Sequence, residues 1–394
     1  MAGPQGWIPL LPMGTQRAAA NGLCVNDRQF LAIGGQSGPR RYLRSCEYYD
    51  TMSELWTACS PTIDMPTNRA FFGATQIGDK VFVMGGKESS SVKTTRSDLI
   101  CLDLSSCGGD LSRISSSATA NANTNWESLQ PMGGKRHRFA CVSHRDYIYV
   151  FGGKNEIGER LSTAERYEVS TNTWSNLPDM PTGAINGSAA GVVGDKIYVV
   201  GGFGADGTML ASTLVFDTLT QEWEHTASTR KSKQESLVVP DMKQTRWGLL
   251  VIVVEQHFLI AIGGDFDKTI EVLDTRKNDS WNFAPIPMKH DKSVAMAGVS
   301  KTGNIIIAGG LVGIEASKTA EFIKFRTGLV PDNVRFEKWK QKNIGDKEAT
   351  IARALAASYK GYSSKKHKTP KSSRCGCTTP KSGRNGGACC GKPK

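Results

Sequence analysis

YIYVFGG at residues 147–153 is the stretch that decides the fold, because five close copies of it occur elsewhere in the chain. The apolar run predicts a strand that is covered on both faces. The two glycines that end it suit a sharp change of direction and a close backbone approach. The copies are FLAIGG (30–35), VFVMGG (81–86), KIYVVGG (196–202), FLIAIGG (258–264) and NIIIAGG (304–310).

The spacing of these copies predicts the architecture. Their second glycines lie 51, 67, 49, 62 and 46 residues apart. Periods of about 40 to 50 residues, each with several short strands, are typical of a β-propeller. We assign the two long intervals to insertions at residues 107–125 and 229–245. We therefore predict an all-β, six-bladed propeller over residues 1–330.

The third repeat shows the order of strands most clearly. FACVSH (139–144) is a first strand, YIYVFGG a second, TAERYEV (163–169) a third, and Trp174 opens an outer strand. The third strand and its Trp recur as CEYYDTMSELW (46–56), TLVFDTLTQEW (213–223) and IEVLDTRKNDSW (270–281). Each Trp is a large apolar plate that suits the gap between neighbouring blades.

The combination of di-glycine, Tyr-Asp or Phe-Asp, Trp, and Met-Pro before a basic residue resembles the kelch repeat. The resemblance covers roughly residues 7–326 and extends in fold to galactose oxidase. It implies a non-catalytic protein-interaction module, an adaptor or scaffold. The alternatives that it leaves open are a substrate receptor for ubiquitination and a small-molecule or sugar-modifying enzyme. The copper and iron ligands of enzymes with this fold do not match this sequence, so we expect no catalytic residue, metal or cofactor.

The start of the chain predicts how the ring closes. WIPLLPM (7–13) followed by Arg17 resembles the end of a repeat that has no beginning, and the sixth repeat has no clear outer strand before Trp339. We expect the N-terminal segment to supply that outer strand, which removes open sheet edges. The competing candidate is residues 334–339.

The positive charge of the chain is concentrated near its C-terminus. Residues 335–394 contain 16 Lys or Arg and 3 Asp or Glu, which leaves 33 basic and 34 acidic residues before them. We predict a linker with a short helix over residues 331–360, the helix itself at 346–359. Residues 361–394 then form a disordered, basic, Cys-containing tail. This tail is a candidate contact for nucleic acid or an anionic surface.

The first residues and the cysteines bear on the compartment. MAGPQGWIPL lacks the basic start and long apolar core of a signal peptide, and no apolar run reaches the length of a membrane span. We expect a cytoplasmic or nuclear protein, with the ten cysteines as reduced thiols.

The candidate binding residues are basic side chains in two classes of loop. The resemblance implies that loops joining one blade to the next open on the same face as loops that follow the di-glycine. Clustered guanidinium groups bind carboxylates through paired hydrogen bonds, so we predict an acidic peptide or domain as the partner. Ordinary solvated loop charge is the alternative. The predicted partner-binding residues are Arg17, Arg40, Arg41, Arg44, Arg69, Arg136, Arg138, Arg246, His290 and Lys292. Further basic residues in the loops after the di-glycines are Lys93, Arg96, Lys154, Arg160 and Lys268.

Overall fold

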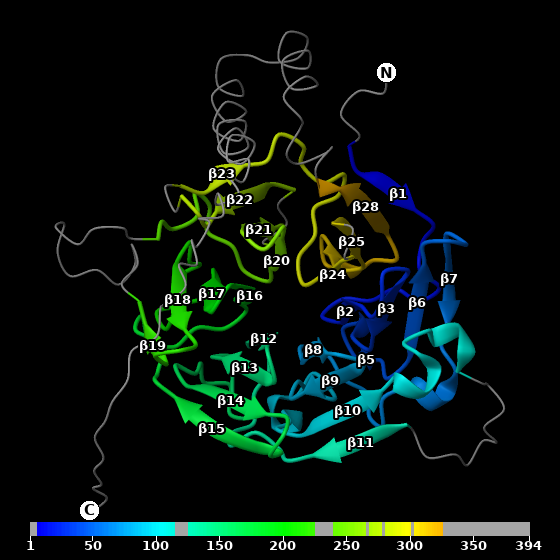
Figure 1. The fold of residues 1–394 in the computed structure, drawn as a ribbon, viewed down its shortest axis with the longest axis horizontal. Coiled ribbons are helices and arrows are strands. Elements are labelled where there is room, and N and C mark those ends of the chain that lie inside the picture. The colour runs from blue at the N-terminus through cyan, green and yellow to red at the C-terminus, as the bar shows by residue number, and fades with distance from the viewer. Residues whose placement is uncertain are drawn as a thin grey trace, which may run out of the picture.

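Six four-stranded antiparallel sheets surround a central axis in the computed structural model of the chain (Figure 1). The structure describes residues 6–114, 125–224, 239–264, 268–277, 280–300 and 303–325. The predicted all-β, six-bladed propeller is therefore confirmed. We number the blades in the order of their di-glycines along the chain.

Blade 3 has the strands expected from its repeat. They are β12 (Ala140–His144), β13 (Tyr147–Phe151), β14 (Ala164–Glu168) and β15 (Thr173–Leu177), from the innermost to the outermost. Neighbouring strands pair antiparallel, so that Tyr149 of β13 lies opposite Val142 and Arg166. The di-glycine follows β13 directly, as the sequence pattern predicts.

The other blades repeat this order. Blade 1 contains β2 (Asn21–Cys24), β3 (Gln29–Ile33), β6 (Cys46–Asp50) and β7 (Leu55–Ala58). Blade 2 contains β8 (Gly73–Ile77), β9 (Lys80–Met84), β10 (Leu99–Asp103) and β11 (Trp126–Leu129). Blade 4 contains β16 (Ala189–Val193), β17 (Lys196–Val200), β18 (Thr213–Asp217) and β19 (Glu222–Trp223). Blade 5 contains β20 (Leu250–Val254), β21 (Phe258–Ile262), β22 (Ile270–Asp274) and β23 (Asn282–Phe283).

Blade 6 closes the ring with a strand from the start of the chain. Its inner strands are β24 (Met296–Val299), β25 (Asn304–Ala308) and β28 (Ala320–Lys324), and its outer strand is β1 (Ile8–Leu10). Ile8 lies opposite Phe322, and β1 lies beside β28 in Figure 1. The prediction that the N-terminal segment closes the last blade is confirmed. The competing segment, 334–339, lies outside the described residues.

Small elements occupy the loops. Two hairpins follow di-glycines, β4 (Gln36–Gly38) with β5 (Arg41–Tyr42) and β26 (Leu311–Val312) with β27 (Glu315–Ala316). The short 3-10 helices are η1 (Pro61–Ile63), η2 (Val92–Thr94), η3 (Ser105–Cys107) and η4 (Leu111–Arg113).

The hydrophobic cores lie between neighbouring blades. Successive residues of a strand point to opposite faces, so each blade contributes to two cores. In β13, Tyr149 and Phe151 pack against blade 4, whereas Ile148 and Val150 pack against blade 2. The tryptophans close the outer ends of these layers. Trp223 of blade 4 meets Phe151 of blade 3 edge to face, with ring centroids 5.5 Å apart.

Backbone contacts at the di-glycines join each blade to the next. The N–H of each second glycine donates to the carbonyl of one residue just before the next blade's first strand, over 2.7 to 2.9 Å. We call these six residues the junction residues. They are Arg17, Arg69, Arg136, Ile185, Arg246 and Lys292.

A second ring of hydrogen bonds surrounds the channel. It is formed by the residues that lie two places after the junction residues. The N–H of each donates to the carbonyl of the equivalent residue in the preceding blade, over 2.7 to 2.9 Å. The bond from blade 1 to blade 6 closes the ring. All six have a positive φ, between 45° and 71°. We call them the mouth residues. They are Ala19, Phe71, Arg138, Gly187, Gly248 and Val294.

The two insertions lie within the two long intervals between di-glycines. The first separates β10 from β11 and buries Cys107 and Leu111, whereas residues 115–124 lie outside the described ones. The second separates β19 from β20; Val239 is buried, and residues 225–238 are not described. The predicted helix at 346–359 and the tail at 361–394 also lie outside the described residues, so the domain boundaries stay a prediction. Among the described residues, no helix is both long and apolar enough to cross a membrane.

The di-glycine contact predicts a strong effect of one methyl group. A Cβ on Gly309 would lie 2.4 Å from the carbonyl oxygen of Arg17, at the junction of the last and first blades. Gly313 has nearly the same φ, 61° against 65°, but nothing lies within 4 Å of its Cβ position. We expect Gly313→Ala to lower the free energy of unfolding by about 1 kcal/mol. Gly309→Ala should lower it by about 3 kcal/mol, since overpacking adds to the backbone strain.

Urea unfolding of the two variants and the wild-type chain measures this difference. Equal losses in the two variants would show that the contact with the Arg17 carbonyl is unimportant.

Candidate functional site

Five of the ten predicted binding residues are buried. The side chains of the basic junction residues are only 1% to 2% exposed, so they present no charge on the surface. Each emerges just before the first strand of its blade and extends toward that blade's own di-glycine. The five are Arg17, Arg69, Arg136, Arg246 and Lys292.

Arg136 shows what these side chains do. Its Nη1 donates to the carbonyl of Gly152 over 2.9 Å, and its Nη2 donates to the buried carboxylate of Glu165. The backbone carbonyl of Arg136 accepts from Gly86 of the preceding blade. Burial lowers the pKa of Arg136, and the charge of Glu165 opposes that effect. One side chain thus connects two neighbouring blades through their di-glycines.

The same arrangement recurs in four other blades. The group that accepts from the cationic side chain is always the carbonyl of the blade's first glycine. The donor and acceptor residues of these hydrogen bonds are Arg17 and Gly34 (2.8 Å), Arg69 and Gly85 (3.3 Å), Arg246 and Gly263 (2.7 Å), and Lys292 and Gly309 (3.0 Å). Ion pairs link Arg17 to Glu47 (2.8 Å), Arg69 to Asp98 (2.7 Å) and Arg246 to Glu271 (3.0 Å). These charges are used inside the propeller.

Blade 4 replaces the ion pair by two apolar side chains. Its junction residue is Ile185, and Leu214 lies opposite Val199 as Glu165 lies opposite Val150 in blade 3. Ile185 and Leu214 belong to one buried cluster. A buried ion pair and a well-packed apolar pair are similar in stability, because desolvation offsets much of the attraction. Both solutions therefore occur at one position of the repeat.

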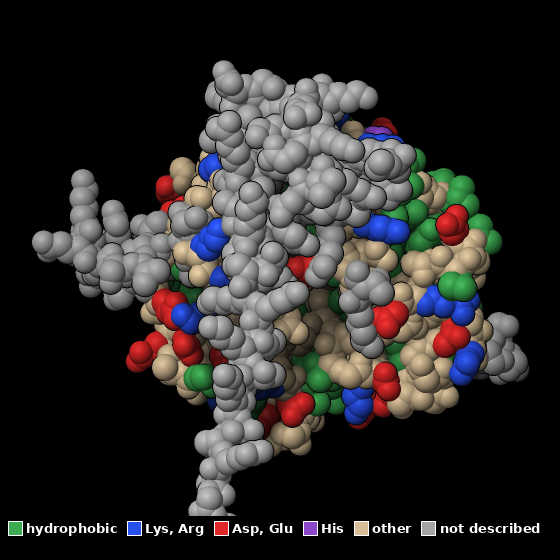
Figure 2. All heavy atoms as spheres, turned by 45° about the horizontal axis from the view of Figure 1, so that its top comes forward, with side chains coloured by type: hydrophobic (Ala, Val, Ile, Leu, Met, Phe, Trp, Pro, Cys, Tyr) green, Lys and Arg blue, Asp and Glu red, His purple; other side chains and the backbone are tan. Residues whose placement is uncertain are grey.

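Four further predicted residues are exposed. Arg40 and Arg41 lie at the β4–β5 hairpin, Arg44 approaches Asp64 to 4.0 Å, and His290 lies 3.4 Å from Glu321. Where the surface is not covered by grey atoms in Figure 2, blue and red side chains are interspersed. Arg44 and His290 thus lie near carboxylates, and Arg40 and Arg41 lie in the hairpin that follows the first di-glycine.

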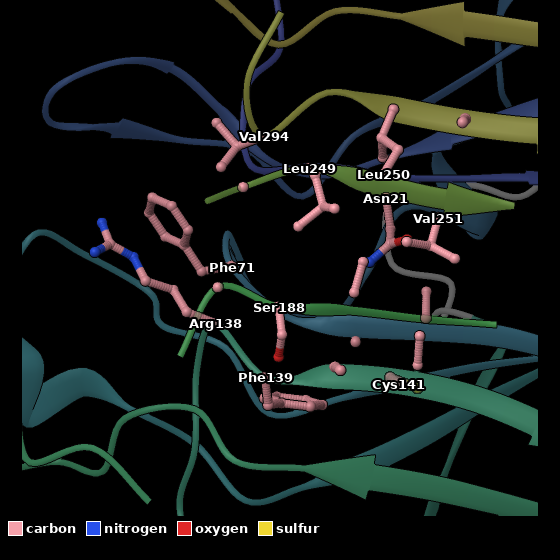
Figure 3. Close-up of a pocket in the computed structure, with 18 of the residues that line it drawn as sticks. Asn21, Phe71, Arg138, Phe139, Cys141, Ser188, Leu249, Leu250, Val251 and Val294 are labelled. Carbon is pink, nitrogen blue, oxygen red and sulfur yellow. The ribbon is translucent and has the colours of Figure 1, made fainter. Parts of the chain in front are cut away.

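A cavity of about 310 Å³ occupies the channel. All six inner strands line it, mostly with small or apolar side chains, and its lining contains no Asp, Glu, His or Tyr. In the described part of the chain, no group of three or more His, Cys, Asp or Glu could hold a metal ion. Figure 3 shows Arg138 and Phe71 side by side at one end of this channel, with Cys141 and Val251 further along it.

Arg138, the tenth predicted residue, lies at the mouth of the channel between two aromatic rings. Its Cζ is 4.4 Å from the centroid of Phe71 and 5.3 Å from that of Trp247. Trp247 lies across Gly187, where a Cβ would be 2.1 Å from its Nε1, and it also contacts Phe203 with centroids 5.6 Å apart. Cation–π contacts of this kind hold a guanidinium group in place without neutralising it.

Two lysines flank Arg138 on the same face. Lys87 and Lys154 directly follow the di-glycines of blades 2 and 3, and they form β-bridges with Ala70 and His137. The expectation that both loop classes open on one face is thereby confirmed. We call Lys87, Arg138 and Lys154 the mouth cluster. Within the described ranges, none of the three forms an ion pair with a carboxylate.

Electrostatics shows that the mouth cluster is crowded. Burial lowers the pKa of Lys87, and the charges of Arg138 and Lys154 lower it further. Burial also lowers the pKa of Lys154, together with Arg160 and Arg138. The pKa of His137 falls to about 3, first through burial and then through the three cations, so His137 is neutral at pH 7. Like charges thus lie near each other here with no described carboxylate paired to them, and the Lys87 ammonium donates to the carbonyl of Ser90 over 3.1 Å.

Sequence reasoning missed part of this site. It placed Arg138 and Lys154 among the basic loop residues but overlooked Lys87, which occupies the same repeat position as Lys154. Aligning the residue after each di-glycine would have found it. Phe71 and Trp247 had no such signal, because only the closed ring brings blades 2, 3 and 5 together at the mouth.

The fold and this loop-built face define a propeller that resembles known proteins. A family model described as the KLHDC2/KLHL20/DRC7 Kelch-repeats domain matches residues 106–310, and the Kelch motif model matches residues 17–62. The first match alone covers more than half of the chain. The protein belongs to the kelch-repeat family, as its sequence resemblance indicates.

Curated relatives agree with this assignment. Kelch-like protein 15 of Homo sapiens is 26% identical over 224 residues, which are 55% of this chain and 35% of that protein. Kelch-like protein 40 of Xenopus laevis is 25% identical over 239 residues, 60% of this chain and 33% of that protein. Alpha-scruin of Limulus polyphemus is 29% identical over 197 residues, 47% of this chain and 20% of that protein. The matched region thus spans about a third or less of each relative's length.

The two kinds of junction predict the outcome of exchanging one for the other. Arg136→Ile leaves Glu165 buried without its partner, so we expect it to lower the free energy of unfolding by about 3–5 kcal/mol. Arg136→Ile with Glu165→Leu reproduces the pair of blade 4 and should be within about 1 kcal/mol of the wild type. Urea unfolding of both variants checks this. A double variant no more stable than the single one would contradict the equivalence of the two junctions.

Proposed function

We propose that this chain is a non-catalytic adaptor or scaffold that binds an acidic segment of a protein partner at the channel mouth. The observation that supports the proposal most is the mouth cluster. Lys87, Arg138 and Lys154 lie on one loop face, and no described carboxylate pairs with them. An acidic partner would supply the negative charge that the described part of the propeller does not place beside this cluster.

The surroundings of Arg138 favour binding by a rigid surface. Phe71 and Trp247 flank its guanidinium group, and the backbone N–H and carbonyl of Arg138 belong to the ring of mouth residues. A side chain that is already fixed loses little conformational entropy when a ligand binds. Arg beside aromatic rings is also the composition typical of interface hot spots.

The channel supports a binding role over catalysis. Its lining offers neither a carboxylate nor a His to act as an acid, base or ligand. The kelch-like relatives and alpha-scruin belong to the same family of propellers, which supports the proposed role in protein interaction.

We place this function in the cytoplasm or the nucleus. The six cysteines in the described ranges are free thiols, the state that reducing compartments maintain. The predicted contact of the 361–394 tail with nucleic acid or an anionic surface stays a prediction, because those residues lie outside the described ones.

Charge reversal at Arg138 tests the proposed contact. We expect that the full-length chain with Arg138→Glu, used as the bait in affinity capture, no longer recovers acidic partners. The substitution places a carboxylate where the acidic groups of the partner would bind. Arg145→Glu is the matched control. Arg145 also has a positive φ, 53° against 57°, but it lies in the turn at the other end of β12 and pairs with Asp195.

The proposal fails if Arg138→Glu and the wild-type chain recover the same partners. Arg69→Glu is expected to act differently from Arg138→Glu. Because Arg69 is buried against Asp98, its reversal should lower the stability of the propeller.

A further inference from the structure

The repeats show that the fold does not require the mouth cluster. The residues after the six di-glycines are, in blade order, Gln36, Lys87, Lys154, Phe203, Asp265 and Leu311, of which Asp265 lies outside the described residues. The mouth residues are Ala, Phe, Arg, Gly, Gly and Val in blade order. Three of these positions are basic, and all three belong to blades 2 and 3. Positive charge therefore gathers at one side of the mouth, at positions where blades 1, 4 and 6 have neutral side chains and where blade 5 has the acidic Asp265 after its di-glycine.

The three cations of the cluster lie in one region of the mouth. Lys87 Nζ lies 5.9 Å from the ring centroid of Phe71, and Arg138 Cζ lies 4.4 Å from the same centroid, so the two groups are within about 10 Å of each other. The backbone of Lys154 bridges that of His137, the neighbour of Arg138 in the sequence. Their mutual effect on the pKa values agrees with this proximity.

Further donors around the cavity lack an acceptor. The Nε of Arg138, the Nε1 of Trp247 and the Oγ of Ser188 are buried and have no hydrogen-bond partner among the described residues. All three residues line the channel cavity. The Nε1 of Trp247 is covered by Gly187. An unsatisfied buried donor costs about 1–3 kcal/mol, so an acceptor oxygen that reaches the Nε of Arg138 or the Oγ of Ser188 would recover that energy.

We propose that the channel mouth binds the phosphate of a phosphoserine or phosphothreonine in the partner segment, held by Arg138, Lys87 and Lys154. This inference rests on the proposed function and names the group that is recognised. A phosphate monoester carries a charge of about −1.5 to −2 at pH 7 and three acceptor oxygens. A carboxylate carries one charge and two oxygens, which would leave most of this cluster uncompensated.

The pH dependence of binding distinguishes a phosphate from a carboxylate. The probes are N-acetyl-phosphoserine methylamide and N-acetyl-glutamate methylamide, titrated calorimetrically into the full-length chain at pH 5.5 and 7.5. The second pKa of the phosphate is about 6, so its dianionic fraction rises about fourfold over this interval. We expect the affinity for the phosphoserine probe to rise about threefold to fourfold. Glutamate stays ionised throughout, and its weaker binding should not rise.

Two substitutions locate the binding in the full-length chain, where the basic tail is the same in every variant. Arg138→Gln and Lys154→Gln should each weaken the phosphoserine probe about tenfold, as the loss of one charge-assisted hydrogen bond does. Arg145→Gln, on the opposite face, should leave the affinity unchanged. The second substitution keeps the test valid if the first variant does not fold.

Three results would overturn the inference. The first is equal affinity for the two probes, or no change with pH. The second is unchanged phosphoserine binding in both Gln variants, which places the phosphate on the tail. The third is at least tenfold tighter binding of adenosine monophosphate at the same residues, which makes the mouth a nucleotide site. If the phosphoserine probe binds as expected but Arg138→Glu recovers unchanged partners, the phosphate site stands and the proposed function fails.

Discussion

The backbone contact between each di-glycine and the next blade is the constraint on which the rest of this propeller depends. The carbonyl of every junction residue accepts the N–H of a second glycine, and it lies only 2.3 to 2.9 Å from where the first glycine's Cβ would be. No larger residue fits at that distance. The repeated Gly-Gly is therefore visible in the sequence because the ring needs it six times, once at each junction. Its six occurrences are why the number of blades could be predicted, whereas the closing strand was predicted from the repeat-end pattern at residues 7–13.

The same contact explains why the predicted binding residues were only partly informative. The carbonyl of a junction residue accepts a hydrogen bond from the di-glycine of the preceding blade. Its side chain can therefore reach the carbonyl of the first glycine in its own blade. Arg136 and its equivalents use their charge in this way. Composition counts these groups as surface charge, although they are buried in ion pairs. A signal did exist: Glu47, Glu165, Glu271 and Glu321 recur at one position of the third strand, and Leu214 replaces the acid in the blade where Ile185 replaces the arginine.

The mouth cluster could not be predicted to the same extent, for a geometric reason. Lys87 and Arg138 are far apart in the sequence and become neighbours only when blades 2 and 3 pack side by side. Trp247 comes from blade 5 and reaches Arg138 because Gly187, between them on the ring, has no side chain to block it. Closing the ring places loops of different blades around one axis. Such neighbours follow from the tertiary fold, and no local pattern encodes them.

At the mouth, side chains can differ from blade to blade while the ring of backbone hydrogen bonds stays closed. The six mouth residues are linked through backbone atoms alone, so the ring of hydrogen bonds does not depend on their side chains. Four of them are not glycine and still adopt a positive φ, including the β-branched Val294. Residues hold such a conformation when the surrounding structure determines it, and such strain is common at functional sites. The backbone ring thus fixes six directions around the channel and leaves each side chain open to change. In blades 2 and 3 those directions carry Phe71 and Arg138, and Lys87 and Lys154 follow the di-glycines beside them. This side of the mouth is therefore where we propose that an anionic ligand binds.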